Sequence, residues 1–195
     1  MTVKQRILKT IYPLIMLKGK WLPSKIDIQK NVVLAPSTTS IYDLELVLND
    51  GNTITLNKYK GQKLVIVNTA SDCGYTGQYD ELESVYTEYK GKVMVIAFPA
   101  NNFQNQESAD DNTIAQFCRM NYGISFPIAK KTSVIKNTHQ HPIFQWLSSK
   151  EKNGWCRQAP IWNFCKYVIN EEGILTHFFS QNISPTSKVF LASLV

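Results

Sequence analysis

Short apolar runs and helix-spaced apolar positions alternate along the chain. Residues 64–67 and 93–98 are continuous apolar runs rich in β-branched residues, which is typical of strands buried on both faces of a sheet. Between these runs, apolar residues recur with helical spacing from Tyr79 to Tyr89, and charged residues occupy the remaining positions. These segments predict a β-α-β unit.

The flanking segments extend this pattern. Residues 42–48 and 53–56 alternate in polarity around Asn49-Asp50-Gly51-Asn52, and residues 166–169 and 174–179 flank a second turn signal, so both pairs predict β-hairpins. Further helices are predicted after Asp110 or Asp111, at 141–149 and at 185–194. The predicted order is ββαβααββα, an α/β fold with a central mixed sheet, flanking helices and an N-terminal β-hairpin.

The net positive charge of the chain comes entirely from the N-terminal segment. Residues 1–30 carry seven Lys or Arg residues and one Asp, whereas residues 31–195 hold fourteen basic and fourteen acidic side chains. The balanced part offers no basic stripe for nucleic acid. Residues 1–36 therefore form a basic, partly apolar extension and linker, and residues 37–195 are the predicted domain.

Three interpretations of residues 1–30 stay open. The apolar stretch at 10–17 barely reaches the length of a secretory signal core. A basic amphipathic segment with Trp21 could instead bind an anionic membrane surface. The third interpretation is an extension packed on the domain or simply mobile. No apolar run reaches the roughly 20 residues needed to span a bilayer.

The cysteines point to redox chemistry. Cys73 lies directly after the first buried run and before the predicted helix, where unpaired backbone N–H groups and the helix dipole favour the thiolate. An inert buried cysteine fits the same position. Cys118, Cys156 and Cys165 are too widely spaced for a disulfide scaffold or a zinc site, so we expect a reducing, cytoplasmic setting with no metal and no cofactor; membrane-surface association and export stay open.

Several segments of the sequence resemble the glutathione peroxidases. The segments 68–79 (NTASDCGYTGQY), 98–107 (FPANNFQNQE) and Trp162-Asn-Phe164 are similar to the three signature blocks of that family, in the same order and spacing. Shorter segments between these blocks are also similar to the family, so the resemblance covers about residues 38–190. It implies a thioredoxin-like fold and a peroxidase that reduces hydrogen peroxide and organic or lipid hydroperoxides.

The resemblance also implies site residues. Cys73 matches the peroxidatic position, and Gln106, Trp162 and Asn163 match the other three positions of the family's catalytic site. Amide and indole N–H groups can hydrogen-bond a thiolate or a peroxide oxygen. Cys118 matches the resolving cysteine of thioredoxin-dependent members, with an inert core thiol as the alternative.

Departures from the family pattern refine these expectations. Ala100 replaces a cysteine that many members carry, and Cys156, expected in an exposed loop, is a second candidate resolver. Asp72 stands where the family often has lysine, and a neighbouring carboxylate would raise the pKa of Cys73. The short stretch 147–162 lacks the loop that tetrameric members use for assembly, which predicts a monomer recycled by thioredoxin rather than by glutathione.

Three functional classes remain open on the sequence. The first is the thiol peroxidase. The second is a peroxide sensor that passes its oxidation to a partner protein, which needs the same Cys73. The third is a disulfide oxidoreductase, which is disfavoured because Thr76 replaces the second cysteine of a Cys-x-x-Cys motif.

Overall fold

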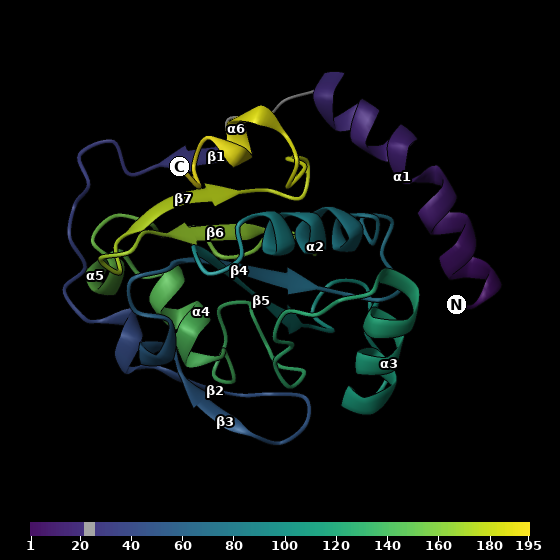
Figure 1. Ribbon diagram of the computed structural model, residues 1–195, viewed down its shortest axis with the longest axis horizontal. Coiled ribbons are helices and arrows are strands. Elements are labelled where there is room, and N and C mark those ends of the chain that lie inside the picture. The colour runs from purple at the N-terminus through teal and green to yellow at the C-terminus, as the bar shows by residue number, and fades with distance from the viewer. Residues whose placement is uncertain (22–25) are drawn as a thin grey trace.

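A five-stranded mixed sheet occupies the centre of the molecule (Figure 1), with strand order β1-β7-β6-β4-β5. The structure is a computed structural model that describes residues 1–21 and 26–195, and its side chains are described outside residues 18–25. The strands are β1 Ile28–Lys30, β4 Lys63–Thr69, β5 Val93–Pro99, β6 Lys166–Ile169 and β7 Leu175–Phe179.

Strand β4 joins the parallel and antiparallel parts of this sheet. It pairs in parallel with β5 and antiparallel with β6, so the sheet is mixed, as predicted. Every residue of β4 from Leu64 to Thr69 is buried. Successive side chains of a strand point to opposite faces, and Leu64 and Ile66 accordingly join one apolar cluster while Val65 and Val67 join the other.

The two clusters are covered by different elements. Helices α2 Gln78–Glu88, α3 Asp111–Tyr122 and α6 Lys188–Leu191 pack over the face of Val65 and Val67. Helix α4 Pro142–Leu147 and the hairpin of β2 Glu45–Val47 and β3 Thr53–Thr55 pack over the opposite face, and helix α5 Lys150–Asn153 follows α4.

Capping residues fix where these helices begin and end. The Asp110 carboxylate accepts a hydrogen bond from the Thr113 N–H at 2.8 Å, and Gly123 ends α3 in the left-handed region at φ 62°, a conformation that glycine adopts without strain. His141 caps α4 by accepting from the Ile143 N–H.

The predicted β-α-β unit and both hairpins are confirmed, with different limits at several elements. The C-terminal helix covers only residues 188–191, and the segments Ile41–Asp43 and Leu56–Tyr59 are 3-10 helices. The pattern of residues 28–30 is too short to predict a strand, yet β1 pairs with β7 at the edge of the sheet.

Helix α1 Val3–Trp21 lies along the side of the molecule near α3 (Figure 1). It contacts the segment that connects β4 to α2, where Lys4 Nζ lies 3.2 Å from Asp72 Oδ2. It also contacts α2 itself, where the Tyr12 hydroxyl donates to Glu81 Oε1 at 2.7 Å. The division into an extension and a domain at residues 36 and 37 stays a prediction. In this structure helix α1 packs on the domain, and β1, which lies within the predicted extension, is a strand of the central sheet.

Candidate active site

Cys73 lies in the turn between β4 and α2. This turn spans residues 70–77, and α2 begins at Gln78, so the cysteine precedes the helix by about one turn. Its side chain is fully buried and carries a free thiol. The position after the carboxyl end of a central strand is where ligands bind in open α/β sheets.

Hydrogen-bond donors converge on the Cys73 sulfur from two parts of the chain. The backbone of Tyr75 and the side chains of Asn163 and Trp162 each lower the pKa of this thiol by hydrogen bonding. Burial is the larger effect and raises the pKa above its ordinary value, because an apolar surrounding disfavours the charged form. The site therefore holds a thiol that is protonated at rest and surrounded by groups that stabilise its anion.

Gln106 reaches this site through Asn163. The Asn163 Nδ2 group donates to Gln106 Oε1 at 2.9 Å, and the Asp72 N–H donates to the Gln106 carbonyl at 3.0 Å. Two left-handed residues, Gln104 and Asn105, form the tight turn just before Gln106. The structure thus brings together Cys73, Gln106, Trp162 and Asn163, the four positions singled out by the sequence.

Asn68 is a site residue that the sequence analysis missed. It is fully buried at the end of β4, where its Nδ2 group donates to the Trp162 carbonyl at 3.0 Å and its Oδ1 atom accepts from the Cys165 N–H at 3.1 Å. Its own carbonyl accepts from the Phe164 N–H. Phe164 is held at φ 66°, which is unfavourable for a bulky residue. A polar residue within an apolar strand was the available signal, because a buried amide needs partners.

Glu107 is the second residue that the sequence analysis missed. Its side chain is 1% exposed and accepts from both the N–H and the hydroxyl of Ser71, at 2.9 and 3.2 Å. Burial raises the pKa of Glu107 to about 7. Its negative charge raises the pKa of Cys73 and also that of Cys118.

The expected effect of Asp72 on the pKa of Cys73 stays a prediction. The Asp72 carboxylate turns to helix α1, where it pairs with Lys4 and accepts from Gln5 Nε2 at 2.8 Å. Glu107 is the carboxylate that raises the pKa of the Cys73 thiol.

The other cysteines are all buried and free. Cys118 lies on the inner face of α3, and burial raises its pKa to about 12, although the nearby Tyr79 side chain acts to lower it. Cys156 is 1% exposed, so its predicted place in an exposed loop is wrong. Cys156 belongs to the apolar cluster that covers one face of the sheet, and the Asn153 side chain fixes its backbone by bonding both its N–H and its carbonyl.

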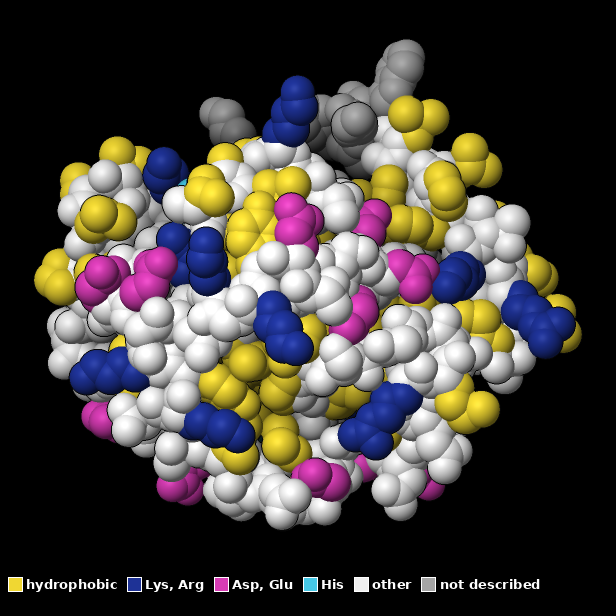
Figure 2. Space-filling model, in the orientation of Figure 1, with side chains coloured by type: hydrophobic (Ala, Val, Ile, Leu, Met, Phe, Trp, Pro, Cys, Tyr) yellow, Lys and Arg dark blue, Asp and Glu magenta, His cyan; other side chains and the backbone are white. Residues whose placement is uncertain are grey.

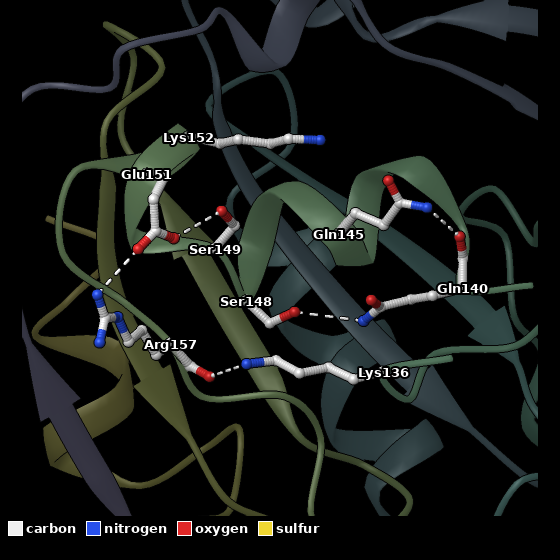
Figure 3. A pocket seen from close by; sticks show the side chains of 8 residues that line it. All are labelled: Lys136, Gln140, Gln145, Ser148, Ser149, Glu151, Lys152 and Arg157. Atoms are coloured by element: carbon white, nitrogen blue, oxygen red, sulfur yellow. Dashed lines mark hydrogen bonds and ion pairs between the residues drawn. The ribbon is translucent and has the colours of Figure 1, made fainter. Parts of the chain in front are cut away.

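A polar hollow beside α4 and α5 offers no comparable chemistry (Figure 3). Its groups satisfy one another: Arg157 pairs with Glu151 at 2.9 Å, and Lys136 Nζ donates to the Arg157 carbonyl at 3.0 Å. It holds neither a cysteine nor a residue of the Cys73 site.

The comparisons with known sequences agree with this site. A family model described as glutathione peroxidase matches residues 41–148. The glutathione peroxidase homolog BsaA of Halalkalibacterium halodurans is 43% identical over 147 residues, which cover 75% of this chain and 92% of that protein. The glutathione peroxidase-like peroxiredoxin gpx1 of Schizosaccharomyces pombe is 39% identical over 145 residues, or 74% and 90% of the two chains.

Solved structures show the same architecture. The apo crystal structure of Trgpx is similar with a TM-score of 0.62 and 30% identity, covering 81% of this chain and 97% of that one. For T. cruzi GPX1 the TM-score is 0.61 at 29% identity, with 80% and 97% covered. A DsbF homologue from Corynebacterium diphtheriae, at 14% identity and a TM-score of 0.59, shares the fold alone.

These similarities confirm the thioredoxin-like fold, and together with the donors around the Cys73 sulfur they define a thiol peroxidase. Because the family model covers more than half of the chain, the chain belongs to the glutathione peroxidase family.

Proposed function

We propose that Cys73 is the peroxidatic residue for hydrogen peroxide and for organic and lipid hydroperoxides. The sulfur attacks the terminal peroxide oxygen, so that an S–O bond forms and the O–O bond breaks. The cysteine is oxidised to a sulfenic acid, and the thiol proton leaves with the departing oxygen as water or an alcohol. The observation that carries this proposal is the convergence of Tyr75, Asn163 and Trp162 on the buried sulfur.

The amide and indole donors have separate roles in this proposal. Asn163 and Trp162 stabilise the developing thiolate, because donors fixed before the reaction need no reorientation. Gln106 accepts from Asn163 with its oxygen, which turns its amide nitrogen toward a bound peroxide. Removal of one such donor costs about a hundredfold in rate at comparable sites.

Cys118 is the proposed resolving residue. Its thiol attacks the Cys73 sulfenic acid, forming a disulfide and releasing water, and thioredoxin then reduces that disulfide by thiol exchange. Cys118 is fully buried on α3 and has a raised pKa, so we expect α3 to open locally before this step. We further propose a monomer that uses thioredoxin in preference to glutathione, with peripheral membrane contact through residues 1–30.

Peroxide consumption by the reduced protein, supplied with either a thioredoxin system or glutathione, tests this proposal. Turnover with thioredoxin should vanish in Cys73→Ser, and Cys118→Ser should still form the first sulfenic acid but fail to cycle. Turnover with glutathione alone would reverse the choice of reductant, and cycling by Cys118→Ser would reject Cys118 as the resolver.

The burial of Cys118 favours one alternative function. A resolver that must first be exposed leaves the Cys73 sulfenic acid free to react with the thiol of a partner protein, as a peroxide-sensing relay would require. A single stoichiometric oxidation without turnover in either reducing system would support this relay over the peroxidase.

A further inference from the structure

Over residues 3–17, whose side chains the structure describes, helix α1 has two apolar faces, one packed on the protein and one facing solvent. The inner face holds Tyr12, which is 9% exposed. The opposite face, here called the outer stripe, is open to solvent: Val3, Ile7, Leu14 and Leu17 are 76%, 56%, 67% and 52% exposed, and Ile11 is 37% exposed. In Figure 2, hydrophobic side chains gather along the edge where Figure 1 places α1.

The inner face holds the helix firmly. A β-carbon added to Gly74 would lie only 2.7 Å from Ile15 Cδ1, and a β-carbon added to Gly77 would lie even closer to the Tyr12 ring. Both glycines therefore allow α1 to approach the domain closely. Polar contacts flank this packing, because Lys9 pairs with Asp80 at 3.0 Å and stacks over the Tyr122 ring at 4.2 Å. The outer stripe therefore stays exposed while α1 remains attached to the domain.

The charge of α1 indicates what covers the stripe. The helix carries Lys4, Arg6, Lys9, Lys18 and Lys20 and no acidic residue. Lys4 and Lys9 pair with Asp72 and Asp80 of the domain, so the surplus positive charge comes from the other three. An apolar stripe on a basic helix matches the headgroup region of an anionic bilayer, and no helix in the described part of the chain is long and apolar enough to cross one. We propose that the outer stripe docks the protein on an anionic lipid surface.

Docking in this way orients the active site. The inner face of α1 contacts Asp72, Gly74 and Gly77, which flank Cys73, so the peroxidatic turn lies about one helix diameter, ~10 Å, from the lipid surface. An apolar groove of 630 Å³ continues from Leu17 of the stripe to Asn182. Asn182 accepts from the Tyr75 hydroxyl at 2.9 Å. Resting on the proposed function, this geometry brings hydroperoxides of the docked bilayer to the side of the molecule that carries the Cys73 turn.

Co-sedimentation of the full chain with vesicles tests the docking surface directly. Wild-type protein should sediment with vesicles of phosphatidylcholine and phosphatidylglycerol, more weakly with phosphatidylcholine alone, and less as salt is added. The double variant I7Q/L14Q keeps good helix formers on α1 and should bind at least about tenfold more weakly, since each removed side chain contributes to partitioning.

The control variant is V32Q/V33Q, because Val32 and Val33 are 81% and 83% exposed but lie outside α1; it should bind like the wild type. Equal binding by I7Q/L14Q and the wild type would overturn the proposal. The proposal would also be overturned if the wild type bound no vesicles and light scattering showed a dimer that I7Q/L14Q does not form, because a second copy of the chain would then cover the stripe.

Activity separates this inference from the proposed function. I7Q/L14Q should reduce hydrogen peroxide at the wild-type rate and lose turnover only with phospholipid hydroperoxides held in anionic vesicles. If the wild type reduces neither substrate, the proposed function fails while the sedimentation result still decides the docking. Equal loss of both activities in the variant would overturn the assigned orientation.

Discussion

At the scale of residues, the Cys73 sulfur is subject to opposing influences. Burial and the charge of Glu107 raise the pKa of the thiol, whereas hydrogen bonds from Tyr75, Asn163 and Trp162 lower it. Hydrogen bonds to an anion act most strongly where water is excluded. The same burial that disfavours the resting thiolate therefore strengthens the donors that stabilise it during attack on a peroxide.

Glu107→Gln should speed oxidation of Cys73 above neutral pH. Below about pH 7 the wild-type Glu107 is protonated, because its pKa is raised to about 7, and the two proteins should react alike. At higher pH the ionised carboxylate raises the pKa of Cys73, and its removal should give a roughly threefold faster reaction. The rate of sulfenic acid formation with hydrogen peroxide, followed by mass spectrometry across pH, measures this difference.

The matched control is Glu172→Gln, which changes an exposed carboxylate in the turn between β6 and β7. Its pH profile should overlie that of the wild type. If Glu107→Gln gives the wild-type rate at every pH, the Glu107 charge does not act on the nucleophile.

At the scale of elements, α1 bridges the two cysteine-bearing parts of the molecule. Lys4 and Gln5 hold Asp72 beside Cys73. Lys9 reaches the C-terminal end of α3, where its Nζ atom lies 3.5 Å from the Asn121 carbonyl. Helix α1 therefore contacts the turn that carries Cys73 and the helix that carries Cys118. This position lets α1 influence how readily α3 opens.

Gly77→Ala should loosen α1 from the domain. Gly77 has φ −58° and ψ −22°, so alanine fits its backbone, but the added β-carbon would clash with the Tyr12 ring. Overpacking of this kind costs about 1–3 kcal/mol. Trypsin cleavage after Lys9 should accelerate by roughly tenfold or more, as judged by limited proteolysis. Ser84→Ala, an exposed position on α2, is the control, and unchanged cleavage in Gly77→Ala would show that this contact does not hold α1.

The elements also show what the sequence could and could not predict. The strands β4 and β5 and helix α2 follow from their own periodicity, because long apolar runs and helical spacing depend on local residues. The three residues of β1 carry no such pattern and form a strand only because β7 offers an edge. The packing of α1 likewise depends on glycines 74 and 77, far along the chain.

The active site likewise contains residues that the sequence could identify and residues that it could not. The family's signature blocks identify Cys73, Gln106, Trp162 and Asn163, which the structure brings together. The roles of Asn68 and Glu107 arise from burial and from contacts across the fold; the apolar run before Asn68 signals a buried amide, but no linear pattern names its partners or those of Glu107. The ion pair of Asp72 has the same origin, since its partner Lys4 lies 68 positions away.

At the scale of the whole molecule, the sheet encloses a lysine. Lys166 is fully buried on β6, where its Nζ atom donates to Gln78 Oε1 at 2.8 Å and to the Ile183 carbonyl at 2.6 Å. It thereby joins β6 to the first turn of α2 and to the segment after β7. Burial lowers the pKa of Lys166 to about 7, so its protonation is linked to global unfolding.

Lys166→Met should change how the free energy of unfolding depends on pH. In the wild type, the buried charge destabilises the fold fully below about pH 7, and this penalty is relieved as pH rises toward the ordinary lysine pKa of about 10.4. Over that window the unfolded chain binds a proton that the folded chain does not, so stability rises with pH. The variant lacks this rise, and its stability relative to the wild type should fall by about 1–3 kcal/mol between pH 7 and pH 9.5.

Urea unfolding at several pH values measures this slope. The comparison is insensitive to the constant cost of losing the two hydrogen bonds of Lys166, because that cost shifts the variant equally at each pH. Lys150→Met, an exposed position on α5, should leave the slope of the wild type unchanged. Parallel pH profiles for Lys166→Met and the wild type would mean that Lys166 stays charged inside the fold, with Gln78 and the Ile183 carbonyl compensating for its burial.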